Sequence, residues 1–152
     1  MSNILLAYFS AEGTTAKKAK ELACTVGADI YEIIPAKPYS AADIKWTNPL
    51  SRCNREWIKK ERPALSDKSA DIAGHDVIFL AFPIWYYSAP LIIRSFLEQY
   101  DFKGKKIVLF ATSGGSSFGK TAQHLASSAP GAEITEGAMM NGSGDFERFK
   151  NL

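Results

Sequence analysis

"YFSAEGTTAK", residues 8–17, joins an apolar run to a segment with the pattern of a helix. A turn into a helix needs only one glycine and one capping hydroxyl group. Here Gly13 is accompanied by three hydroxyl groups, on Ser10, Thr14 and Thr15. Hydroxyl groups beside the unpaired backbone N–H groups of a helix start favour a bound phosphate. Plain helix capping by Ser10 or Thr14 is the alternative interpretation, and the loop lacks the Gly-Lys pair that closes a Walker motif.

The rest of the chain alternates between strand patterns and helix patterns. Runs that are apolar without alternation indicate buried strands of a parallel sheet, and these are Ile4–Phe9, Val77–Phe82 and Ile107–Ala111. Shorter strands fit 29–34 and 133–135, and helical patterns fit 16–26, 93–100, 118–128 and 145–152. This alternation predicts an α/β fold, in which an open sheet with right-handed crossovers has helices on both faces.

The length of 152 residues fits a single domain, 1–152, with an irregular insert at about 36–71. The insert is rich in proline and carries the aromatic residues Tyr39, Trp46 and Trp57. Long connections of this kind within a compact domain are often functional. The sequence is consistent both with a lid over a ligand and with a packed structural loop.

Composition and charge exclude several classes of protein. Lysine and arginine number 18 against 16 acidic residues, a net charge of +2 that is too balanced for a nucleic-acid-binding protein. The longest apolar runs have six residues, too few to span a bilayer, and no signal-peptide pattern is present. Two cysteines do not suggest a disulfide scaffold, and no metal ligands occur at a useful spacing. We therefore expect a cytoplasmic protein without a bound metal.

The loops after the strong strands are the place to look for a ligand, because such sheets bind ligands beyond the carboxyl ends of their strands. The second of these loops, PIWYYSAP at 83–90, has three adjacent aromatic residues that cannot all turn inward. They predict either a stacked planar ligand or a cap over the sheet edge. The third loop, TSGGSSFG at 112–119, offers backbone N–H and C=O groups or is a flexible connection. Together with the first loop, they predict a pocket for a phosphorylated planar heterocycle.

These three loops resemble those of the flavodoxin family. YFSAEGTTAK is similar to the FMN phosphate loop of the family, FPIWYYSAP to the loop that holds the isoalloxazine, and ATSGGSSFG to the loop beside the pyrimidine ring. The resemblance runs nearly end to end and points to a short-chain member, since no long insertion interrupts the last strand. It implies a flavodoxin-like three-layer sandwich, with a five-stranded parallel sheet of order 2-1-3-4-5, and noncovalent FMN as cofactor.

The resemblance also assigns cofactor-binding roles to individual residues. The phosphate would be held by Ser10, Glu12 through its backbone N–H, Gly13, Thr14 and Thr15. Trp85 would stack on or flank the flavin, in a loop shaped by Pro83, Ile84, Tyr86 and Tyr87. The ring edge would be contacted by Thr112, Ser113, Gly114, Gly115, Phe118 and Gly119. No residue stands out as an acid or base, so the redox chemistry would belong to the flavin.

The charge of the chain departs from that of electron-carrying flavodoxins, which are strongly acidic, because its sequence pI is about 8.5. We therefore hypothesise a flavin-dependent oxidoreductase that passes electrons from a reduced donor such as NAD(P)H to a small acceptor such as a quinone. Tyr39, Trp46 and Tyr87 are candidate walls of its substrate pocket. The alternatives are a flavodoxin that shuttles electrons between protein partners and a non-enzymatic FMN-binding module. The sequence leaves the donor, the acceptor and the oligomeric state open.

Overall fold

The computed structural model describes residues 3–10, 13–37, 50–52, 55–56, 62–66, 69–84, 89–112, 118, 121–140 and 149. Its elements follow the chain in the order β1 (Ile4–Tyr8), α1 (Thr14–Val26), β2 (Asp29–Glu32), β3 (Val77–Pro83), α3 (Leu91–Gln99), β4 (Lys106–Thr112), α4 (Thr121–Leu125), the 3₁₀ turn η1 (Ala126–Ser128) and β5 (Glu133–Met139). The strands form one five-stranded sheet of order β2-β1-β3-β4-β5, and all its pairs are parallel. The predicted fold and strand order are confirmed.

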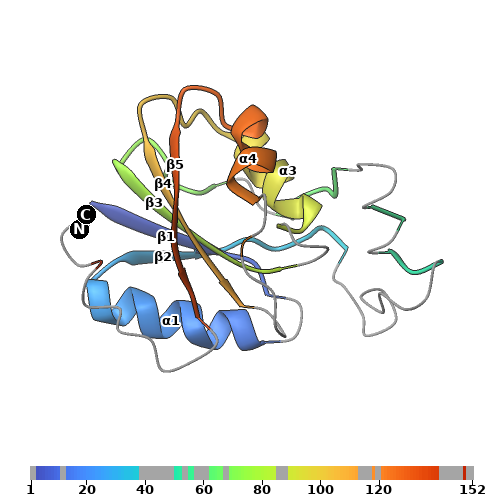
Figure 1. Ribbon diagram of the computed structural model, residues 1–152, viewed down its shortest axis with the longest axis horizontal. Helices are drawn as coiled ribbons and strands as arrows, with labels where there is room; N and C mark the ends of the chain where they lie inside the picture. Colours follow the sequence, from blue (N-terminus) through green and yellow to red (C-terminus); the bar gives the residue numbers. More distant parts are fainter. Residues whose placement is uncertain are drawn as a thin grey trace.

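The central strands β1, β3 and β4 are buried along almost their whole length because helices cover both faces of the sheet. Figure 1 shows α1 on one face and α3 with α4 on the other. Successive strand residues point to opposite faces, so each run supplies two cores. Leu6 and Phe79 pack with Leu22 of α1, whereas Leu80 packs with Phe96 of α3 on the other face. Two covered faces explain why these runs are apolar without alternation.

Strand β5 is longer than the predicted strand at 133–135 and runs to Met139. A β-bulge makes this extension possible, because Leu109 of β4 pairs with Glu136 while Phe110 pairs with Ala138. Gly137 is therefore the extra residue, and a Cβ atom there would lie 2.8 Å from the carbonyl oxygen of Leu109 and from the ring of Phe110. The sequence predicts the strand only as far as Thr135, but in the structure it continues through Gly137, the residue that forms the bulge.

The helix predicted at 118–128 is shorter in the structure. It begins at Thr121, whose backbone N–H and hydroxyl group both donate to the carbonyl oxygen of Phe118. After Leu125 the chain tightens into η1, and the N–H of Ala129 donates to the carbonyl of Ala126 in a 3₁₀ pattern. Pro130 follows, and the residue before a proline is disfavoured in a helix. Of the segment predicted as a helix at 145–152, only Phe149 is described, and its side chain is buried.

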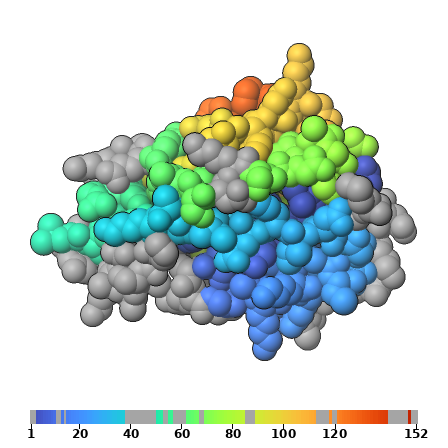
Figure 2. Space-filling model, turned by 180° about the vertical axis from the view of Figure 1, so that it is seen from behind, coloured from blue at the N-terminus to red at the C-terminus, as the bar shows by residue number. Residues whose placement is uncertain are grey.

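The two ends of the insert predicted at about 36–71 meet just beyond β2. Pro35 and Leu65 form an antiparallel bridge that joins the entry and the exit of this segment. Within the insert, Arg52 and Glu56 form a buried ion pair with an N–O distance of 2.8 Å, and Arg52 also donates to the carbonyl oxygen of Lys37. The described insert residues project from one end of the molecule in Figure 1 and, seen from behind, in Figure 2.

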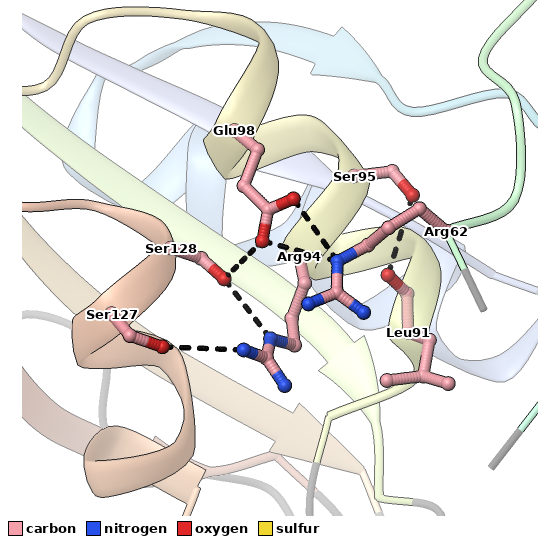
Figure 3. Close-up of polar contacts among 7 residues, drawn as sticks. All are labelled: Arg62, Leu91, Arg94, Ser95, Glu98, Ser127 and Ser128. Atoms are coloured by element: carbon pink, nitrogen blue, oxygen red, sulfur yellow. Dashed lines mark hydrogen bonds and ion pairs between the residues drawn. The ribbon is translucent and has the colours of Figure 1, made fainter. Parts of the chain in front are cut away.

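The exit of the insert is tied to the helices by a polar network, the Glu98 cluster, which consists of Arg62, Arg94, Glu98, Ser127 and Ser128 (Figure 3). Arg62 donates to both carboxylate oxygens of Glu98 on α3, at 3.0 and 3.1 Å. Ser128 of η1 donates to Glu98 at 2.7 Å and accepts from Arg94 at 3.0 Å, and Ser127 accepts from Arg94 at 3.2 Å. The cluster thereby connects the insert, α3 and η1.

Candidate functional site

The carboxyl ends of the three strong strands lie next to one another, as the sequence predicts. Tyr8, the last residue of β1, pairs with Ala81 of β3, and Pro83, the last residue of β3, pairs with Thr112, the last residue of β4. Just past β3, the N–H of Ile84 still donates to the carbonyl oxygen of Thr112, at 2.8 Å. The three predicted ligand loops therefore leave the sheet at the same edge, where α1 also begins (Figure 1).

The loop between β1 and α1 is folded around Gly13. The N–H of Gly13 donates to the hydroxyl oxygen of Ser10 at 2.9 Å, and its carbonyl oxygen accepts the N–H of Lys17 at 3.1 Å. Gly13 has a φ of 94°, and a Cβ atom would meet nothing within 4 Å. Glycine is therefore required here for its left-handed backbone conformation, not because of a close neighbour.

This loop has the donors that an anion needs. The first residues of α1 have backbone N–H groups without acceptors inside the helix, and the helix dipole makes this end positive. The first turn of α1 carries no acidic side chain. Ser10 accepts a hydrogen bond from Gly13 through an oxygen lone pair, so this bond does not use its hydroxyl proton. The geometry therefore fits a phosphate group, which accepts hydrogen bonds at every oxygen.

The structure connects the first and third loops through Thr15 and Thr112. Their hydroxyl oxygens lie 2.8 Å apart, and the two residues are only 2% and 5% exposed. The sequence analysis placed Thr15 at the phosphate and Thr112 at the ring edge. A hydrogen bond between these two side chains was not predicted, because they are 97 residues apart in the chain.

The remaining predicted site residues fall into two groups. Pro83 and Ile84 are half-buried at the end of β3, and Phe118 is buried. Thr14 begins α1, but its side chain is not described. Outside the described residues lie Glu12, Tyr39, Trp46, Trp85, Tyr86, Tyr87, Ser113, Gly114, Gly115 and Gly119. Their roles stay predictions.

Tyr8 is a further polar group beside the phosphate loop, and the sequence analysis did not single it out. Burial raises the pKa of its phenol, and the charge of Glu32 and a hydrogen bond with Glu32 raise this pKa further. Tyr8 therefore stays protonated at neutral pH and donates to Glu32. Its position as the last residue of β1, directly before the hydroxyl-rich loop, was the signal available in the sequence.

The described part of the chain contains neither a cluster of metal ligands nor a helix suited to a membrane. No group of three or more His, Cys, Asp or Glu residues in this part of the chain could hold a metal ion. Among the helices described here, none has the length and apolar character that crossing a membrane requires.

Comparison with known proteins gives a consistent result. The family model described as flavodoxin matches residues 3–152. A proposed flavoprotein of Bacteroides eggerthii is 45% identical, with a TM-score of 0.89 over 97% of this chain and 92% of that one. A proposed flavoprotein of Bacteroides uniformis is 43% identical, with a TM-score of 0.89 over 96% of each chain.

A more distant structure shares the fold. It is a flavoprotein of Lactobacillus acidophilus in complex with FMN, 20% identical, with a TM-score of 0.72 over 90% of this chain and 92% of that one. No protein of curated function matches the chain.

Proposed function

The chain belongs to the flavodoxin family, and on this basis we propose that it binds FMN noncovalently and works as a flavin-dependent oxidoreductase. Electrons would pass from a reduced donor such as NAD(P)H to a small acceptor such as a quinone. The observation that supports this proposal is the loop before α1, where the Ser10 hydroxyl, Gly13 and the first turn of the helix have a geometry that fits a phosphate.

The polypeptide would supply binding and orientation, and FMN would supply the electron-transfer chemistry when it is bound. Ser10, Gly13 and Thr15 would hold the phosphate at the start of α1. The planar ring would extend toward the ends of β3 and β4, where the half-buried Ile84 would provide apolar surface. Trp85, in the loop after β3, would stack on the ring.

No residue of the chain needs to act as an acid or a base in this proposal. The phenol of Tyr8 has a raised pKa and donates to Glu32, so Tyr8 keeps its proton. The protein would tune the flavin through the hydrogen bonds and the charges that surround it.

The charge of the chain favours an oxidoreductase over an electron carrier. Carriers in this family are strongly acidic, and their charge steers them to basic partners. This chain has 18 basic and 16 acidic residues, so its long-range attraction to a basic partner would be weak. The carrier alternative predicts efficient reduction by a flavoprotein reductase at a rate that falls steeply with salt. A third alternative is a non-enzymatic FMN-binding module, which would show neither activity.

The first experiment is an absorption spectrum of the purified protein after incubation with FMN and removal of free ligand. A retained flavin band with resolved shoulders is expected, and a colourless protein would contradict FMN binding. Steady-state oxidation of NAD(P)H with a quinone then tests the enzyme. A rate no higher than that of free FMN would refute the oxidoreductase while leaving the FMN site intact.

A further inference from the structure

We propose that Thr112 acts on the phosphate of FMN through Thr15, as a positioning residue, and does not contact the flavin ring. This inference rests on the proposed FMN site and deepens it. It gives Thr112 a different role from the ring-edge contact that the sequence predicts. The observation behind it is the buried pair of hydroxyl oxygens, 2.8 Å apart, that joins the end of β4 to the first turn of α1.

Either hydroxyl of the pair could be the donor, and a phosphate bound to Thr15 would fix the direction. Each threonine hydroxyl has one proton and two lone pairs, so one of the two must donate to the other. Only one proton is left for a third group. Thr15 is the second residue of α1 and therefore lies at the phosphate-binding end of the helix. A phosphate dianion only accepts hydrogen bonds, so Thr15 would donate to it, and in that arrangement Thr112 would donate to Thr15.

Thr112 is well placed to fix the orientation of Thr15. It is the last residue of β4, and its carbonyl oxygen accepts the N–H of Ile84, so its backbone is held against the residue that follows β3. The hydroxyl of a threonine can otherwise turn to other polar groups nearby, such as backbone groups. A donor on a rigid strand holds Thr15 in one rotamer. Donation into Thr15 also polarises the hydroxyl bond that Thr15 makes to the phosphate.

A comparison of FMN with riboflavin tests this assignment, because riboflavin has the same ring and ribityl chain but lacks the phosphate. We expect Thr112→Val, which replaces the hydroxyl by a methyl group, to weaken FMN binding about three- to tenfold. Riboflavin binding should stay within about twofold of wild type, since no phosphate is involved. Thr112→Ser keeps the hydroxyl and is the matched control that should restore FMN affinity.

A double-mutant cycle on the same titration tests the relay itself. Because Thr112 acts only through Thr15, adding Thr112→Val to Thr15→Val should cause no further loss of FMN affinity. Equal weakening of FMN and riboflavin by Thr112→Val would overturn the inference, since it would indicate a ring or ribityl contact. Unchanged FMN affinity would overturn it as well.

The test separates this inference from the proposed function. If wild-type protein binds FMN, the site is established. The FMN and riboflavin affinities of the variants then test only the role of Thr112. Wild-type protein that binds neither ligand would refute both. Thermal unfolding of each apo-protein shows whether the variant is folded. If Thr112→Val does not fold, Thr112→Ala and Thr112→Ser give the same comparison, and Thr112→Ala is expected to lose FMN affinity selectively.

Discussion

Nε2 of His75 lies 2.7 Å from Oδ2 of Asp29 and joins the segment before β3 to the start of β2. The other ring nitrogen, Nδ1, lies 2.7 Å from the carbonyl oxygen of Asp71. Both neighbours are hydrogen-bond acceptors, so only the doubly protonated ring can donate to both. The pair sits at the amino-terminal edge of the sheet, opposite the proposed FMN site.

This pair predicts a pH-dependent stability. Burial by itself lowers the pKa of His75, but the hydrogen bonds to Asp29 and Asp71 and the negative charges of both residues outweigh it and raise the pKa above 6.5. The unfolded chain has the ordinary value, so protonated His75 stabilises the fold. This stabilisation is fully present below about pH 6.5 and is lost as the pH rises through the raised pKa of the folded state.

Urea unfolding of the apo-protein at a series of pH values measures this effect. The free energy of unfolding of wild type should fall relative to that of His75→Gln as the pH rises from about 6 to 9. His124, the other histidine, is exposed on α4, so His124→Gln should keep the wild-type dependence. Parallel curves for wild type and His75→Gln would contradict the prediction.

Gly137 in the bulge of β5 should not tolerate a side chain. A Cβ atom there would lie 2.8 Å from the carbonyl oxygen of Leu109 and from two ring atoms of Phe110. Gly137→Ala should therefore lower the free energy of unfolding by about 1–3 kcal/mol, measured by urea denaturation. Glu136→Ala, at the adjacent exposed position, is the control and should stay within about 0.5 kcal/mol of wild type. Equal stability of the two variants would show that the strand relaxes without cost.

The bulge in β5 marks a part of the fold that the sequence did not predict. The central strands were predictable because burial on both faces leaves an unbroken apolar run, as in Val77–Phe82. The end of β5 was not, because glycine in a sequence is equally typical of a turn and of a bulge. After a turn the strand pairing would end, whereas after a bulge it continues. In this structure it continues, because Phe110 pairs with Ala138.

For the candidate site, the sequence predicts which residues take part but not the hydrogen bond between two of them. The position of Thr15 in a hydroxyl-rich loop after a buried strand was enough to predict a phosphate site. The hydrogen bond between Thr15 and Thr112 depends on how α1 is rotated against β4, and no local sequence pattern predicts that rotation. The residue Thr112 was predicted to belong to the site, but its partner came only from the structure.

The Glu98 cluster offers two neighbouring serines with unequal roles (Figure 3). Ser128 is buried, donates to Glu98 and accepts from Arg94, so its hydroxyl bridges two charged groups. Ser128→Ala should lower the free energy of unfolding by about 1–2 kcal/mol, because Glu98 and Arg94 each lose a partner. Ser127 is exposed and accepts from Arg94 at its hydroxyl oxygen. Ser127→Ala should change stability by less than about 0.5 kcal/mol.

Chemical denaturation of both serine variants at low and high salt completes this test. Water can replace the exposed Ser127 hydroxyl as a partner of Arg94, but it reaches the buried position of Ser128 poorly. High salt screens charges but does not change burial, so the stability difference between the two variants should persist at high salt. Two equally stable variants would mean that the Ser128 bridge contributes nothing.

Phe149 closes the core on the face of the sheet that α1 covers. Its ring meets that of Phe110 edge-on, with centroids 4.9 Å apart, and that of Phe79 at 6.4 Å. Edge-to-face pairs add to the stabilisation from buried apolar area. Phe149→Ala should therefore lower the free energy of unfolding by about 3 kcal/mol, through lost apolar burial and the cavity left behind.

Phe149→Leu separates the two contributions, because leucine fills most of the space without an aromatic ring. It should lose only about 1 kcal/mol, and its near-ultraviolet circular dichroism should change where the aromatic contacts are lost. If Phe149→Ala is as stable as wild type, the buried ring of Phe149 does not contribute to the stability of the core. If both variants lose the same amount, the ring geometry outweighs the buried volume, and the edge-on contact with Phe110 is what this position requires.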